Sequence, residues 1–290
     1  MPASSLQSTA PACTKPTLDL GPGMTRRAVL QPRQADGRFR LNRYPVGEAL
    51  EPWLDFHWII EWDLPDEQVH SQRVLPFPNH HLVFEAGVTA LHGISRGVFH
   101  RQLQGRGRVH GLRFKCGGLR PWLSQPLRAL AGRSTSPAPC LPEGLDLSAA
   151  EVLVLQAGTH DEAVARAERL LYARRPARDP WVARLDAAVR AAQADPSVTR
   201  TAFLQDRLGL GERALQRCFA DYLGVSPKWV IQRARLHDAL FALSAEAESS
   251  LAELALRLGF CDQAHFSRCF RQHTGLTPQQ YRHAARPEPV

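Results

Sequence analysis

The sequence contains no long apolar run. None of its stretches approaches the about 18 consecutive apolar residues that mark a transmembrane helix. The first residues also lack the apolar centre that a secretory signal requires. We therefore expect a cytoplasmic protein with no membrane partner.

Motifs of several catalytic sites are missing as well. The six cysteines form no C-x-x-C pair, and the chain has no G-x-S-x-G element and no P-loop. A DNA-repair methyltransferase would need a cysteine-rich zinc site, which six scattered cysteines do not supply. We expect reduced thiols, no cofactor, no metal and no enzymatic activity.

The chain has an excess of positive charge, with a formal net charge of +8 over 290 residues. Such an excess favours a polyanionic partner. It is spread along the sequence, because residues 196–290 hold 12 Lys and Arg against 9 Asp and Glu. A DNA-binding function must therefore be argued from helix faces and not from bulk charge.

Residues 251–282 have the pattern of a helix, a short turn and a second helix. Ser250 is a good N-cap for the first helix, and Gly259 ends it. Asp262 is a good N-cap for the second helix, which Gly275 ends. Thr277 followed by proline then begins a third helix. This order predicts a helix-turn-helix unit whose second helix enters a major groove.

The same unit occurs earlier in the chain. Fifty-one residues upstream, Arg217-Cys218-Phe219 matches Arg268-Cys269-Phe270, and the segment 224–227 matches 275–278. Between the copies, residues 227–243 have the pattern of one continuous helix. Repetition at a fixed offset is stronger evidence for the unit than either copy alone.

Two helix-turn-helix units joined by a helix resemble the DNA-binding domain of the AraC/XylS family, over residues 197–282. The resemblance implies double-stranded DNA and RNA polymerase as partners. It also implies two recognition helices in successive major-groove segments, about one helical turn (~34 Å) apart. The positions that it assigns to the DNA face are Arg213, Gln216 and Arg217 in the first helix and Gln263, Ala264, His265, Ser267 and Arg268 in the second.

The first copy departs from this pattern. Gln205 stands where the second copy has the small Ala255, and Thr201 stands where the second copy has Leu251. Gly211 stands at the N-cap of the first recognition helix, where Ser or Asp is preferred. We therefore expect the first unit to be less tightly packed than the second.

The N-terminal half is rich in predicted strands. Residues 55–62 are aromatic and β-branched and end at a turn around Pro65. With the flanking segments, they resemble a cupin-like domain of the kind found ahead of some AraC-type modules, which implies an effector-binding or homodimer-forming role. The other predicted strands cover residues 74–75, 81–85, 88–92, 97–103 and 108–114.

Residues 137–142 have the composition of a linker, and helices are predicted at 145–174 and 181–194. These helices either form a dimer interface or brace, or simply pack around the barrel. The predicted division is a disordered tail (1–37), a β-rich cupin-like domain (38–135), a linker with connecting helices (136–195) and an AraC-type DNA-binding domain (196–285).

No acidic residue lies between Glu85 and Glu143, whereas nine basic residues do. One hypothesis is a pocket or surface for an anionic effector that includes Arg108 and Arg113; a solvated face or contact with DNA phosphates are the alternatives. The usual cupin metal-ligand pattern is not visible, and adjacent His80 and His81 are expected to point to opposite sheet faces, so at most one of them could bind a metal.

The sequence thus predicts an α+β protein of two domains, with a β-rich cupin-like N-terminal domain followed by an all-α tandem helix-turn-helix domain. We expect a transcription regulator controlled by a small-molecule effector. The alternatives are an effector-independent DNA-binding protein with a structural N-terminal domain and a cupin-like metalloenzyme.

Overall fold

The computed structural model describes residue 30 and residues 37–245 and 250–285. The predicted tail, 1–37, lies outside the described residues except at Leu30 and Gly37. Leu30 is fully buried, and its amide donates a hydrogen bond to the carbonyl of Arg73 over 3.0 Å. The prediction of a disordered tail is therefore wrong at Leu30, because this side chain packs in the core of the second helix-turn-helix unit.

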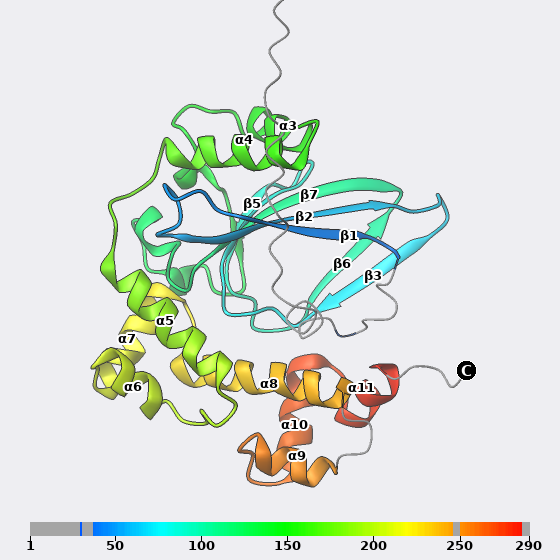
Figure 1. Cartoon of the computed structure of the whole chain (residues 1–290), viewed down its shortest axis with the longest axis vertical. Coiled ribbons are helices and arrows are strands. Elements are labelled where there is room, and N and C mark those ends of the chain that lie inside the picture. Colours follow the sequence, from blue (N-terminus) through cyan, green and yellow to red (C-terminus); the bar gives the residue numbers. More distant parts are fainter. Residues whose placement is uncertain (1–29, 31–36, 246–249, 286–290) are drawn as a thin grey trace, which may run out of the picture.

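The N-terminal half forms an antiparallel sheet of six strands in the order β1-β2-β7-β4-β5-β8 and a separate strand pair, β3 with β6 (Figure 1). The predicted strand at 55–62 lies within the central β2. The sequence did not predict β1 or β8. The bounds are β1 (Arg40–Pro45), β2 (Leu54–Asp63), β3 (Val69–Val74), β4 (His81–Phe84), β5 (Ala90–His92), β6 (Phe99–Gln104), β7 (Arg106–Phe114) and β8 (Ser134–Thr135).

Two helices, α3 (Leu147–Leu155) and α4 (His160–Tyr172), cover one face of the sheet (Figure 1). The single helix predicted at 145–174 is wrong. The chain breaks because Thr159 caps a new helix, its hydroxyl accepting a hydrogen bond from the amide of Glu162. The linker predicted at 137–142 is also wrong, since it contains a 3-10 helix, η3 (Ala138–Cys140). Its Cys140 is buried in the core between the sheet and the helices α3 and α4.

The remaining helices form two small cores joined by one helix. The helix α8 (Pro227–Ala245) contributes Val230 and Ile231 to the first core and Leu236 and Leu240 to the second. The first core also holds α5 (Pro180–Ala194), α6 (Ala202–Leu208) and α7 (Glu212–Tyr222), and the second holds α9 (Leu251–Arg257), α10 (Gln263–Thr274) and α11 (Pro278–Ala285).

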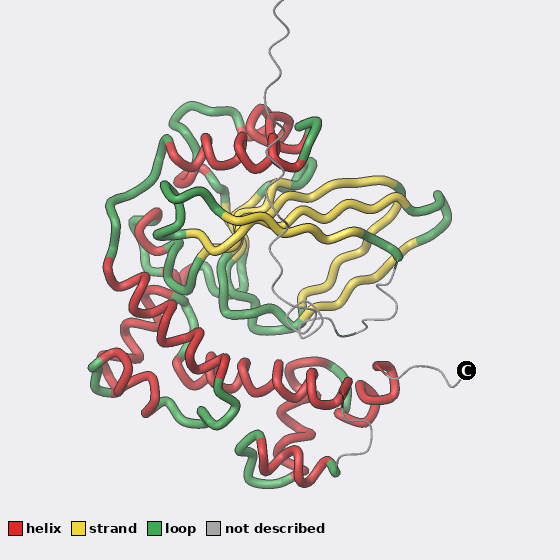
Figure 2. The backbone as a smooth tube through the Cα atoms, in the orientation of Figure 1, coloured by secondary structure: helices red, strands yellow, loops and turns green. Residues whose placement is uncertain are grey.

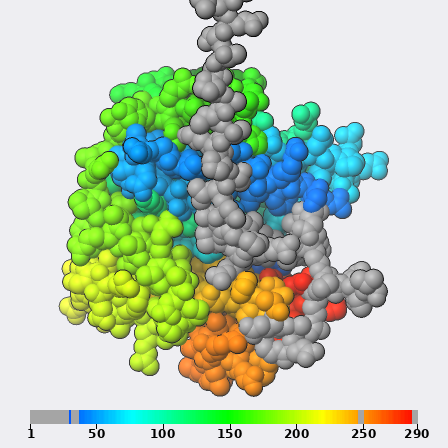
Figure 3. Space-filling model, in the orientation of Figure 1, coloured from blue at the N-terminus to red at the C-terminus, as the bar shows by residue number. Residues whose placement is uncertain are grey.

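Strands lie only in the N-terminal half, and the described residues of the C-terminal part form helices joined by loops (Figure 2). This arrangement confirms the predicted fold class, a β-rich part followed by an all-α part. No helix in the described part of the chain is long and apolar enough to cross a membrane. In the space-filling view the residues that follow the N-terminal strands, coloured green to yellow, form one continuous surface with them (Figure 3).

Candidate nucleic-acid interface

The second unit has the geometry that its caps predict. Ser250 caps α9 by accepting a hydrogen bond from the amide of Ala252. Asp262 caps α10, with 2.6 Å between its carboxylate oxygen and the amide nitrogen of His265. Gly275, at φ 75°, ends α10 in the left-handed conformation that glycine adopts at little cost. These contacts confirm the predicted starts and end of the helices.

Burial separates the two faces of α10. Phe266, Cys269 and Phe270 are buried against α8, α9 and α11. The His265 ring makes an edge contact with Phe260, at 5.4 Å between ring centroids, which limits the directions in which it can point. The opposite face carries the predicted DNA-facing residues; Gln263, Ala264, His265 and Arg268 are exposed, and Ser267 is half-buried.

The first unit follows the same plan with weaker capping. Leu215 and Phe219 are buried, which leaves Arg213, Gln216 and Arg217 exposed on the other face of α7. The N-cap residue, Gly211, has no side chain to accept a hydrogen bond from the first turn of α7.

Packing of the preceding helix also differs between the copies. Gln205 on α6 is half-buried, whereas Ala255 on α9 is fully buried. Together with the missing cap on α7, this difference agrees with the expected looser packing of the first unit.

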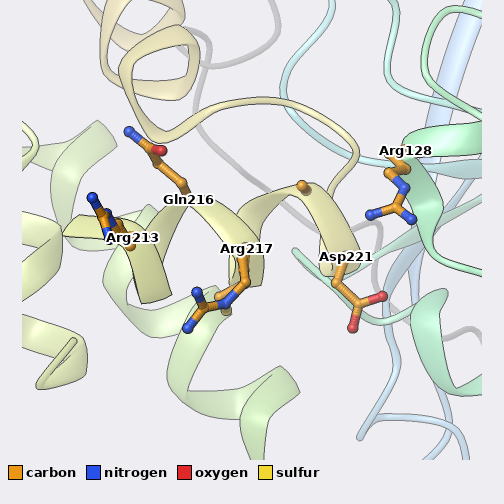
Figure 4. Close-up of a pocket in the computed structure, with 7 residues that line it drawn as sticks. Arg128, Arg213, Gln216, Arg217 and Asp221 are labelled. Carbon is orange, nitrogen blue, oxygen red and sulfur yellow. The ribbon is translucent and has the colours of Figure 1, made fainter. Parts of the chain in front are cut away.

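The exposed face of α7 borders an open concavity of about 650 Å³. Figure 4 shows Arg213, Gln216 and Arg217 pointing outward from α7, with Arg128 facing the end of the helix from another part of the chain. Arg128 belongs to the 3-10 helix η2 (Leu127–Ala129) of the N-terminal half. The sequence placed Arg128 in a basic segment, but it gave no signal that this side chain lies beside α7.

The helix α8 determines the separation of the two units, which lie at its two ends (Figure 1). It has 19 residues. At 1.5 Å per residue it is about 28 Å long. This length is close to one turn of B-DNA, about 34 Å, so both recognition helices can lie on one face of a duplex.

The N-terminal half contacts both units at matching points. Arg96 donates a hydrogen bond to the carbonyl of Gly224 over 3.5 Å, just beyond the C-terminus of α7. Arg73, on β3, donates to the carbonyl of Thr274 over 2.9 Å, at the C-terminus of α10. Both guanidinium groups lie at the negative end of a helix dipole, where a cation is stabilising. The sequence did not predict either contact.

A buried arginine joins α8 to the N-terminal half. Arg233 is 1% exposed and donates hydrogen bonds to the carbonyls of Arg96, over 2.7 Å, and Pro76, over 3.4 Å. Burial lowers the pKa of Arg233 to about 10, so it stays charged at neutral pH. Close by, the rings of Phe77 and His237 are stacked with centroids 4.0 Å apart. The middle of α8 is therefore fixed against the loops that flank β3 and β6.

The structure does not bring Arg108 and Arg113 together. They lie on opposite faces of β7, because they are five residues apart in a strand of regular register. Arg108 pairs with Glu61 over 2.7 Å and donates to the carbonyl of Ala157, while Arg113 lies 3.3 Å from Asp55 and over the ring of Phe77. The two guanidinium groups therefore do not share one pocket, and effector binding by either of them stays a prediction.

The adjacent histidines have different surroundings. His80 is fully buried in the protein interior, and burial lowers its pKa to about 3, so its ring is neutral. His81 accepts a hydrogen bond from the indole of Trp58 over 3.1 Å. Within the described ranges, no group of three or more His, Cys, Asp or Glu side chains has an arrangement that could hold a metal ion.

Comparison with known families divides the chain in the same way as its helices and strands. Residues 204–284 match a helix-turn-helix domain family, and residues 42–136 match a domain family of unknown function. The transcription factor PqrA of Proteus vulgaris, described as probable, is 33% identical over 79 residues, which cover 27% of this chain and 64% of that protein. The transcriptional activator RhaR of an Enterobacter strain is 35% identical over 75 residues, 26% of each chain.

These curated relatives are thus matched over less than two thirds of their own length. A solved transcriptional regulator from Chromobacterium violaceum, which has an AraC-type DNA-binding domain, is 30% identical over 37% of this chain and 96% of that chain, with a TM-score of 0.33. The helix-turn-helix family match spans α6 to α11, the two tandem units described above. The chain belongs to the AraC/XylS family of regulators.

Proposed function

We propose that this protein is a sequence-specific DNA-binding transcription regulator, in which α7 and α10 occupy successive segments of the major groove. The observation that carries the proposal is the pair of exposed polar helix faces at the two ends of α8. Each face lies opposite a fully buried aromatic core, Phe219 in one unit and Phe266 with Phe270 in the other. Both faces are therefore rigidly held.

The side chains on these faces have the chemistry that base recognition needs. Arg213, Arg217 and Arg268 can each bind guanine O6 and N7 with two parallel hydrogen bonds. Gln216 and Gln263 can bind adenine N6 and N7 in the same manner. His265 and Ser267 can donate to base edges or phosphates, and Ala264 can contact a thymine methyl group.

Selection of random DNA by the full-length protein tests this proposal. We expect an asymmetric motif with two conserved blocks about ten base pairs apart, because α8 separates the units by nearly one helical turn. A motif with one block would show that only one unit recognises bases. No enrichment at any salt concentration would contradict the proposal.

A matched pair of variants then tests the assignment of a base contact. Arg268→Ala should cost about 1–3 kcal/mol on the best site and relax specificity at one position. Arg268→Lys keeps the charge but loses the two-pronged hydrogen bonding, so it should relax specificity at that position too. If Arg268→Ala weakens binding equally on all sequences and Arg268→Lys restores it, Arg268 contacts a phosphate.

Control by the N-terminal half is the second part of the proposal. Its support is the set of hydrogen bonds from Arg73 and Arg96 to the ends of α10 and α7. A small-molecule effector, a homodimer and contact with RNA polymerase belong to this part as predictions. Measuring the DNA affinity of Arg73→Ala and Arg96→Ala tests it, because a purely structural N-terminal domain would leave the affinity unchanged in variants that stay folded.

A further inference from the structure

Arg128 belongs to the N-terminal half but lines the same concavity as the exposed face of α7. The residues of α7 that border this concavity are Arg213, Gln216, Arg217, Cys218, Ala220 and Asp221, and Arg128 lies across from the last of them (Figure 4). The side chain of Arg128 is exposed. No carboxylate in the described part of the chain lies within ion-pair distance of it.

The position of Arg128 relative to α7 is fixed by its neighbours. Leu127 is fully buried, and its carbonyl oxygen would lie 2.5 Å from a Cβ atom placed on Gly224. This close approach holds η2 against the turn that follows α7. Arg120 forms an ion pair with Asp221, at 2.9 Å between Nε and the carboxylate oxygen, and so fixes the same end of α7 from the side.

These contacts also change the charge beside α7. Asp221 alone would repel a DNA phosphate, but Arg120 neutralises it. Arg128 then adds an exposed positive charge at the C-terminal end of the concavity that Arg213 and Arg217 also line. A recognition helix contacts bases mainly through its N-terminal residues, so a cation beside its C-terminal end lies nearer to the DNA backbone.

We propose that Arg128 binds a backbone phosphate of the DNA segment that α7 recognises, so that the DNA interface extends onto the N-terminal domain. This inference rests on the proposed DNA-binding function. Phosphate contacts determine position and affinity but not sequence. Arg128 therefore fixes the orientation of the first unit, whose own N-cap lacks a side chain, without contributing to base preference.

The test is the salt dependence of DNA affinity, measured by fluorescence anisotropy with full-length protein and the selected duplex. The logarithm of the association constant falls with the logarithm of salt concentration, with a slope of about −0.9 per phosphate contact. Arg128→Ala should therefore reduce the steepness of this slope by about 0.9, and its affinity deficit should shrink about 3.5-fold between 50 and 200 mM salt. The deficit should be the same on all sequences.

Arg133→Ala is the matched control, because Arg133 is also exposed on the N-terminal half but does not line the concavity. It should leave the slope unchanged, and Arg128→Lys should retain most of it. An unchanged slope in Arg128→Ala, or a deficit confined to certain sequences, would overturn the phosphate contact while wild-type binding stands. Absence of wild-type binding to any duplex would instead overturn the proposed function itself.

Discussion

Replacing Gly224 by alanine should reveal how tightly the N-terminal half is held against the first helix-turn-helix unit. Gly224 has a φ of +75°, and alanine in this left-handed region costs about 1–2 kcal/mol. The new Cβ atom would also lie 2.5 Å from the carbonyl oxygen of Leu127 and 2.9 Å from its carbonyl carbon. Because these are backbone atoms, relief requires η2 to move away from α7, and such overpacking costs about 1–3 kcal/mol more.

Gly209→Ala is the control for the backbone cost alone. Gly209 ends α6 at a φ of +66°, and a Cβ atom there would meet nothing within 4 Å. Gly209→Ala should therefore lower the free energy of unfolding only by the about 1–2 kcal/mol that alanine costs in the left-handed region. The difference between the two variants isolates the contact between the domains.

Urea unfolding of the full-length proteins, followed by circular dichroism, measures both losses. We expect the midpoint of Gly224→Ala to lie clearly below that of Gly209→Ala, by about 0.3–1 M for a slope near 3 kcal/mol per M. Equal midpoints would refute the close approach of η2 to α7. That result would also remove the fixed position on which the role of Arg128 depends.

Three further outcomes follow from the caps and from a buried histidine. Asp262→Ala should destabilise α10 by about 1 kcal/mol and weaken DNA binding, whereas Asp262→Asn should retain the cap; equal unfolding midpoints for both variants would contradict the role of the cap. Gly211→Ser should stabilise the protein by about 0.5–1 kcal/mol in the same assay, because the extended backbone at Gly211 accepts a side chain and serine can cap α7. Burial lowers the pKa of His80 to about 3 from 6.5, so the unfolded state takes up a proton first as the pH falls below 6.5. The free energy of unfolding should thus fall between pH 6.5 and pH 3, by up to about 1.4 kcal/mol per pH unit. Urea unfolding measured at a series of pH values should show a shallower fall for His80→Phe.

The sequence predicted the C-terminal helices well because local signals define them. Asp262 and Gly275 each act through hydrogen bonds or backbone angles within a few residues, and the structure contains them where they were expected. The exposed faces of α7 and α10 follow from the positions of Phe219 and Phe270, which are fixed by helical periodicity. Base contacts by these faces stay a prediction.

Contacts between distant segments were not predictable in the same way. The 137–142 segment has the composition of a linker, yet Cys140 and Leu141 are buried because the sheet and α3 surround them. Arg96 and Arg128 appeared only as members of the basic segment between Glu85 and Glu143, and Arg73 was not singled out at all. Nothing local indicates which helix end each one approaches. Arg108 and Arg113 were assigned together to a possible anion-binding pocket or surface, and the register of β7 places them on opposite faces.

The contacts of Arg73 and Arg96 have a consequence for the spacing of DNA sites. Arg73 lies in β3, and Arg96 lies just before β6, which pairs with β3. One strand pair therefore holds the ends of both recognition helices. B-DNA turns by about 34° per base pair, so a rotation of that size of one unit relative to the other would match half-sites that differ in separation by a single base pair. The length of α8 sets the approximate distance between half-sites, and this strand pair would then fix that distance to the base pair by holding the rotation of the two units.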